Sequence, residues 1–122
     1  MANLLIVEDE YELLQTIAET LEMAGHRCDT APDGRVALDL FRRRGYDLIL
    51  SDINMPRVSG LDLYQGVRGE GYRGPFIFIT GFAVPDGIPD LRPERERLLQ
   101  KPFSLTGMVG VVSDLLEGAR VA

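Results

Sequence analysis

The sequence predicts an α/β fold in which helices cover both faces of a parallel β-sheet. Two observations predict it. Short apolar, β-prone runs alternate with segments whose apolar residues recur at helical spacing, which is typical of parallel strands joined by right-handed crossovers. The run at residues 48–50 is apolar at every position, as expected of a strand that helices cover on both sides.

The chain has 122 residues, 45% hydrophobic and 26% charged, which predicts one globular domain spanning residues 1–122. The net charge of −6 argues against direct nucleic-acid binding, which needs clustered lysine and arginine. We expect a cytoplasmic protein without membrane insertion, because no uncharged apolar stretch could span a bilayer and no secretory signal opens the sequence. The single cysteine, Cys28, excludes an internal disulfide and is expected to be a small buried hydrophobe.

Three strands and two helices are expected in the first half of the chain. Strands are predicted at residues 3–7, at residues 26–31 and at the apolar run that leads to Asp52. The first helix should stop at Gly25, and the second should open after the turn Pro32-Asp33-Gly34. Their apolar faces are predicted to comprise Leu13, Leu14, Ile17, Ala18, Leu21 and Ala24 in the first helix and Val36, Ala37, Leu40 and Phe41 in the second.

The second half predicts two more strands and two more helices. Ser59 is expected to cap a helix that contains Leu61, Tyr64 and Val67, and a fourth strand is expected at residues 76–80. A short fifth strand is expected within residues 95–100. Ser104 is a candidate cap for the last helix, whose apolar stripe should comprise Leu105, Met108, Val109, Val112, Leu115 and Leu116.

Five polar residues stand where the predicted strands end: Glu8 and Asp9, Asp52, Thr80 and Lys101. Each alone has an ordinary structural explanation, such as a turn former, a helix N-terminus or a surface charge. Taken together they are not ordinary, because the carboxyl ends of parallel strands meet at one edge of the sheet, where such folds bind ligands. We therefore expect one site at that edge.

The chemistry of these residues points to a metal ion and a phosphoryl group. Carboxylates brought close together repel one another unless a cation lies between them, and Mg²⁺ prefers oxygen ligands. A lysine ammonium and a threonine hydroxyl are suited to contact phosphoryl oxygens. Of the 13 lysine and arginine residues only Lys101 is a lysine, which suggests that an ammonium is required there.

The chain resembles the receiver domain of two-component response regulators from residue 4 to about residue 116. The matching motifs are Glu8-Asp9 after the first strand, Asp52 with Asn54-Met55-Pro56 and Gly60 after the third, Thr80-Gly81 after the fourth and Lys101-Pro102-Phe103 after the fifth. The resemblance implies a flavodoxin-like, doubly wound, five-stranded parallel sheet of order 2-1-3-4-5 in a three-layer α/β/α sandwich.

The resemblance also implies a role for each site residue. Asp52 is expected to accept a phosphoryl group from a phosphohistidine on a sensor histidine kinase or a histidine phosphotransfer protein. Asp9 and Asp52 should bind Mg²⁺ through their carboxylates, Asn54 through its backbone carbonyl and Glu8 through water, with Mn²⁺ as an alternative ion. Lys101 should contact the phosphoryl group and Thr80 should move towards it.

The expected outcome is a signalling switch. The added charge is expected to reorganise nearby loops and so regulate a downstream protein that the sequence does not identify. The resemblance implies autodephosphorylation but no turnover of an external substrate.

The sequence departs from the family pattern in two places. Leu98 stands where receivers usually carry an aromatic residue, although Phe82 could supply a different one. Residues 81–97 contain Pro85, Pro89 and Pro93, so the fourth helix of the family is expected to be short, displaced or absent. We hypothesise that phosphorylation orders this segment.

Two alternative functions remain open at this stage. An aspartate-nucleophile phosphatase would also use Mg²⁺ and an aspartyl phosphate, but such enzymes carry a second aspartate two residues after the nucleophile, where this chain has Asn54. A binding module that keeps the receiver shape without phosphorylation is the other alternative.

Overall fold

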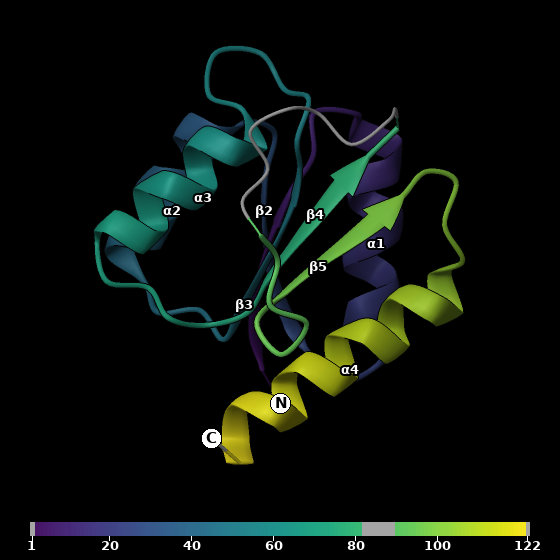
Figure 1. Cartoon of the computed structure of the whole chain (residues 1–122). Coiled ribbons are helices and arrows are strands. Elements are labelled where there is room, and N and C mark those ends of the chain that lie inside the picture. The colour runs from purple at the N-terminus through teal and green to yellow at the C-terminus, as the bar shows by residue number, and fades with distance from the viewer. Residues whose placement is uncertain (1, 82–89, 122) are drawn as a thin grey trace.

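The computed structural model describes residues 2–81 and 90–121, which form five strands and four helices (Figure 1). The strands are parallel and lie in the order β2-β1-β3-β4-β5, as the family resemblance implied. The elements are β1 (Asn3–Val7), α1 (Tyr11–Met23), β2 (Arg27–Ala31), α2 (Gly34–Arg43), β3 (Leu48–Asp52), α3 (Gly60–Gly69), β4 (Phe76–Thr80), β5 (Glu96–Gln100) and α4 (Leu105–Val121).

Two hydrophobic cores lie on opposite faces of the sheet, and α1 with α4 covers one while α2 with α3 covers the other (Figure 1). The strands supply both cores, because successive side chains of a strand point to opposite faces. In β1, Leu4 and Ile6 pack under α1 and α4, whereas Leu5 and Val7 pack under α2 and α3. This two-sided burial explains the continuous apolar runs of β1, β3 and β4.

The strand register brings the carboxyl ends of the strands level with one another. Val7 of β1 pairs with Ser51 of β3, and Asp52 pairs with Ile79 of β4. Thr80 in turn pairs with Gln100 at the end of β5. The residues that end these strands or follow them directly therefore share one edge of the sheet.

The predicted apolar faces are wrong at the helix ends. Ala24 is exposed because α1 stops at Met23, and Val36 and Leu105 are 37% and 38% exposed in the first turns of α2 and α4. In α3 the fully buried positions are Leu63 and Val67, four residues apart on one face, while the predicted Leu61 is only half-buried.

Cys28 was predicted to be buried, and the structure places it half-buried in β2. The reason is that β2 is an edge strand, with a neighbour on one side only. Its thiol packs against the core under α1, and burial raises its pKa to about 12, which makes it a poor nucleophile.

Between β4 and β5, residues 90–95 form no helix, and β5 begins at Glu96 within the predicted range. Phe82, Pro85 and Pro89 lie outside the described residues, so the predictions made for residues 82–89 remain predictions. Within residues 2–81 and 90–121, no helix has the length and apolar character needed to cross a membrane.

Candidate functional site

Three carboxylates converge at the carboxyl edge of the sheet. Glu8, Asp9 and Asp52 each place an oxygen within 4.8 Å of the others. Asp9 is exposed, whereas Glu8 is fully buried and Asp52 is 4% exposed. The backbone N–H of Glu8 donates to Ala31 of β2 at 3.1 Å and so holds the residue directly beyond β1.

Asp52 is the last residue of β3, and both of its carboxylate oxygens are engaged. Oδ1 accepts a hydrogen bond from the backbone N–H of Asn54 at 3.1 Å, and Oδ2 accepts one from Lys101 Nζ at 3.0 Å. The Asn54 bond turns the chain back over the strand end. The Lys101 bond joins β3 to the chain that follows β5, which is separated from it by β4 in the sheet.

The start of α3 packs directly on the backbone of Asp52. A Cβ on Gly60 would lie 2.2 Å from the Asp52 carbonyl oxygen, and the Gly60 N–H donates to the Ile53 carbonyl at 2.9 Å. Ser59 caps the helix as predicted, in a capping box in which Ser59 and Asp62 bond each other's backbone N–H groups. The capped helix therefore fixes the loop that carries Asn54.

Lys101 ties the carboxylates together. Its Nζ lies 3.0 Å from Asp52 Oδ2 and 3.1 Å from Glu8 Oε1. Burial alone would lower the pKa of Lys101, but its contacts with Asp52 and Glu8 together outweigh burial and raise the pKa, so the side chain stays charged. The Lys101 N–H donates to the Thr80 carbonyl at 2.7 Å, which holds the ends of β4 and β5 together.

Glu8 is destabilised in its charged form. Its pKa is raised to about 7, mainly by burial and further by the charge of Asp52, while a hydrogen bond from Glu10 N–H acts in the opposite direction. Glu8 Oε1 is buried without a hydrogen bond within the described chain, since its contact with Lys101 is an ion pair of poor hydrogen-bond direction. With three carboxylates and one ammonium, the pocket has a formal excess of two negative charges. Such an all-oxygen donor set suits Mg²⁺.

The structure places each predicted site residue at this edge. The distances given above show that the fold brings together Glu8, Asp9, Asp52 and Lys101. The backbone N–H of Asn54 donates a hydrogen bond to Asp52. Thr80 is buried at the end of β4, beside Lys101 in the backbone hydrogen-bond pattern.

Gly81 follows Thr80 directly and adds no side chain to the site. A Cβ at Gly81 would meet only the Lys101 side chain among described atoms, at 3.7 Å, which is an ordinary contact. The backbone at Gly81 therefore does not crowd the site.

Sequence reasoning missed two structural supports of this region. One is the contact of Gly60 with the Asp52 backbone: Gly60 stands in the receiver motif quoted above, but the motif alone did not predict this packing role. The other is the part-buried ion pair of 2.7 Å between Arg68 of α3 and Glu96 of β5, which no local pattern indicates.

The comparison with known families now bears on this geometry. The family model of the response regulator receiver domain matches residues 4–113. The chain belongs to this family. The receiver motifs identified in the sequence lie together at the carboxyl edge of the sheet.

Relatives and solved structures agree with this assignment. The transcriptional regulatory protein PcoR of Escherichia coli is 32% identical over 121 residues, a match that covers 98% of this chain and 54% of PcoR. The receiver protein CpdR of Brucella abortus is 29% identical over 120 residues, covering 98% of this chain and all of CpdR. This receiver domain thus spans about half of the first relative and the whole of the second.

Among solved structures, the response regulator TrrA of Thermotoga maritima was crystallised in complex with Mg²⁺ and BeF. It is 29% identical with a TM-score of 0.82, and the match covers 94% of this chain and 99% of TrrA.

Proposed function

We propose that this receiver domain accepts a phosphoryl group on the carboxylate of Asp52 in a Mg²⁺-dependent reaction. One observation carries the proposal. The Asp52 carboxylate is held between Lys101 Nζ and the Asn54 N–H, within 4.8 Å of two further carboxylates. This arrangement has little use in stabilising the fold, because it concentrates negative charge around a buried glutamate.

The donor would be a phosphohistidine on a sensor histidine kinase or a histidine phosphotransfer protein. An Asp52 oxygen attacks phosphorus, the phosphorus–nitrogen bond breaks, and the leaving imidazole nitrogen takes a proton from water. Such transfers depend on in-line positioning and on neutralised oxygens rather than on covalent chemistry by the protein. The two hydrogen bonds of Asp52 and the packing of α3 against its backbone support this role for Asp52.

The remaining site residues would hold the metal and the transferred group. Asp9 and Asp52 would bind Mg²⁺ through carboxylate oxygens, Asn54 through its backbone carbonyl and Glu8 through a water molecule, and Mn²⁺ would fit the same oxygen ligands. When bound, Mg²⁺ neutralises charge on the carboxylates and on the phosphoryl oxygens. Lys101 would exchange its bond with Asp52 Oδ2 for one with a phosphoryl oxygen, and the Thr80 hydroxyl would move towards the same group.

A protein that delivers the phosphoryl group must dock beside Lys101. An apolar recess of about 250 Å³ lies there, lined by Leu13, Pro102, Phe103 and Leu105. A largely apolar recess next to a charged site is the kind of surface that an apolar partner residue fills. We propose that the histidine-bearing donor docks here, and that a separate downstream protein reads the phosphorylated state.

A cytoplasmic location is part of this proposal, because an unpaired cysteine such as Cys28 is typical of a reducing compartment. Autodephosphorylation by water completes the cycle. Turnover of an external phosphoester is not proposed, since the amide of Asn54 cannot relay a proton as the second aspartate of such phosphatases does.

The proposal is tested by the intact mass of the protein after incubation with Mg²⁺ and acetyl phosphate. We expect a gain of one phosphoryl group that disappears in Asp52→Asn and in excess chelator. Asp33→Asn is the matched control, because it removes a half-buried carboxylate from an N-cap that asparagine serves equally well. A gain that persists in Asp52→Asn would contradict the assignment of Asp52.

A further inference from the structure

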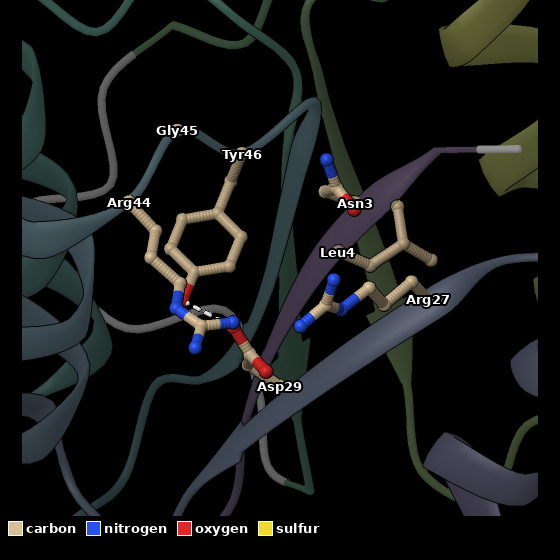
Figure 2. A pocket seen from close by; sticks show the side chains of 7 residues that line it. All are labelled: Asn3, Leu4, Arg27, Asp29, Arg44, Gly45 and Tyr46. Carbon is tan, nitrogen blue, oxygen red and sulfur yellow. Dashed lines mark hydrogen bonds and ion pairs between the residues drawn. The ribbon is translucent and has the colours of Figure 1, made fainter.

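A second pocket lies at the opposite edge of the sheet from Asp52. The amino ends of β1 and β2 and the chain that enters β3 enclose a cavity of about 270 Å³ (Figure 2). The polar lining of this cavity includes Arg27, Asp29, Arg44 and Tyr46. The phosphoryl chemistry at the carboxyl edge does not use any of these residues.

The strand register explains why these side chains meet. Asn3 pairs with Arg27 and Leu5 pairs with Asp29, so Arg27 and Asp29 project from the edge strand β2 to the face that α2 and α3 cover. Tyr46 packs in the core of that same face. The mouth is open at Gly45, where an added Cβ would meet no described atom within 4 Å.

The pocket carries more positive than negative charge. The Tyr46 hydroxyl donates to Asp29 Oδ2 at 2.7 Å, and Arg44 reaches the same oxygen only at 3.4 Å, with half of its side chain exposed. Arg27 has no side-chain hydrogen bond or ion pair within the described chain, although its guanidinium points towards the carboxylate of Asp29 in Figure 2. The pocket thus holds two guanidiniums and one carboxylate, in a chain whose net charge is −6.

Two solvated surface arginines would be the simplest explanation of this pattern, but the cavity argues against it. Both guanidiniums point into one hollow, where Tyr46 anchors Asp29 (Figure 2). The long Arg44–Asp29 contact is exposed and therefore weak, so a ligand can displace it at little cost.

We propose that this pocket binds a small phosphate-bearing ligand, with its phosphate between Arg27 and Arg44 and a ligand hydroxyl donating to Asp29. A phosphate offers three oxygens to two guanidinium forks, whereas one fork is enough to occupy both oxygens of a carboxylate. Asp29 Oδ1 accepts no hydrogen bond within the described residues and faces the same cavity, so a hydroxyl next to the phosphate would find an acceptor. The volume suits a small phosphomonoester rather than a dinucleotide.

The pocket is separate from the phosphoryl site. Five residues of β3 lie between Tyr46 at this edge and the site beyond Asp52, which corresponds to roughly 16 Å at about 3.3 Å per residue. Binding here therefore needs neither Mg²⁺ nor Asp52, and its failure would leave the proposed phosphoryl chemistry intact.

The test is a titration of the ¹⁵N-labelled chain with glycerol 3-phosphate in excess chelator, followed by amide chemical shifts. We expect saturable shifts at Arg27 and Gly45 that are the same in Asp52→Asn. Arg27→Gln and Arg44→Gln should each weaken binding about tenfold, because each removes a charge-assisted hydrogen-bonding fork. Arg43→Gln, an exposed arginine outside the pocket, is the matched control and should bind as the native chain does.

Inorganic phosphate should bind the same residues more weakly than glycerol 3-phosphate, because it lacks the carbon chain whose hydroxyl would donate to Asp29. The proposal is overturned if the shifts rise linearly without saturation, if Arg43→Gln weakens binding as much as Arg27→Gln, or if acetate binds as tightly as phosphate. The spectra also report whether each variant is folded, so loss of binding and loss of structure are distinguished.

Discussion

Replacing Gly60 with alanine tests the close packing that positions the phosphoacceptor. The new Cβ would lie 2.2 Å from the Asp52 carbonyl oxygen and 2.8 Å from Ile53 Cα, whereas a carbon and an oxygen normally stay about 3.3 Å apart or more. Both neighbours are backbone atoms, which cannot rotate aside. The start of α3 must therefore retreat by roughly 1 Å, and this breaks the hydrogen bond from Gly60 to Ile53.

The magnitude follows from three effects. Overpacking costs about 1–3 kcal/mol and the lost hydrogen bond about 1 kcal/mol, while alanine in place of glycine in a helix returns about 0.5–1 kcal/mol. We expect Gly60→Ala to lower the free energy of unfolding by about 2 kcal/mol, a large part of the stability of a domain this size. Asp52 should also be phosphorylated more slowly, because its carbonyl moves with the loop.

Urea denaturation measures the change, and Gly110→Ala is the matched control. Gly110 is exposed in α4, and a Cβ there would meet no described atom within 4 Å. The same substitution should therefore raise the free energy of unfolding by about 0.5–1 kcal/mol. If Gly60→Ala proved as stable as the native chain, the reasoning from this close contact would be refuted.

Three further predictions concern charged and titratable groups. Arg68→Met should lower the free energy of unfolding by about 3 kcal/mol, because it leaves Glu96, which is 4% exposed, without its ion-pair partner. Arg42→Met removes an ion pair on the exposed surface and should change the free energy of unfolding little. Urea denaturation compares the two variants. Burial lowers the pKa of His26 below its ordinary 6.5, which favours the neutral imidazole in the folded chain. The stability that depends on neutral His26 should therefore be complete above pH 6.5 and be lost as the pH falls through the lowered pKa. An NMR titration of this single histidine that gave a pKa of 6.5 or more would contradict this prediction. The pKa of Glu8 is raised from 4.5 to about 7, so without metal the chain should lose stability as the pH rises between these values. Mg²⁺ should therefore raise the melting temperature more at pH 8 than at pH 5.5. Equal gains in melting temperature at both pH values would contradict this prediction.

Much of the fold was predictable because its determinants are local. The strands β1, β3 and β4 are nearly continuous apolar runs, and burial on both sides of the sheet is what makes them so. The site was predictable for a related reason. In a parallel sheet the residues that end the strands lie at the same edge, so the proximity of Asp52 and Lys101 could be predicted from the sequence.

The features that were not predictable depend on contacts between distant parts of the chain. Arg68 and Glu96 pair across 28 residues, and neither lies in a recognisable motif. The exposure of Val36 and Leu105 depends on where each helix begins relative to the sheet, which periodicity alone does not fix. The pocket around Arg27 and Arg44 arises from strand register, so its residues carry no sequence signal of their own.

The central claim is that Asp52 carries the phosphoryl group, and reductive trapping tests it most directly. Borohydride converts an aspartyl phosphate into homoserine, and cleavage after Arg44 and Arg57 releases residues 45–57, which hold both Asp52 and Asp47. Asp47 is an internal control, because it bonds Asn3 N–H at the far edge of the sheet. After treatment with acetyl phosphate and Mg²⁺, fragment masses should place homoserine at position 52 and leave aspartate at position 47. Homoserine at position 47, or at any position other than 52, would contradict the account.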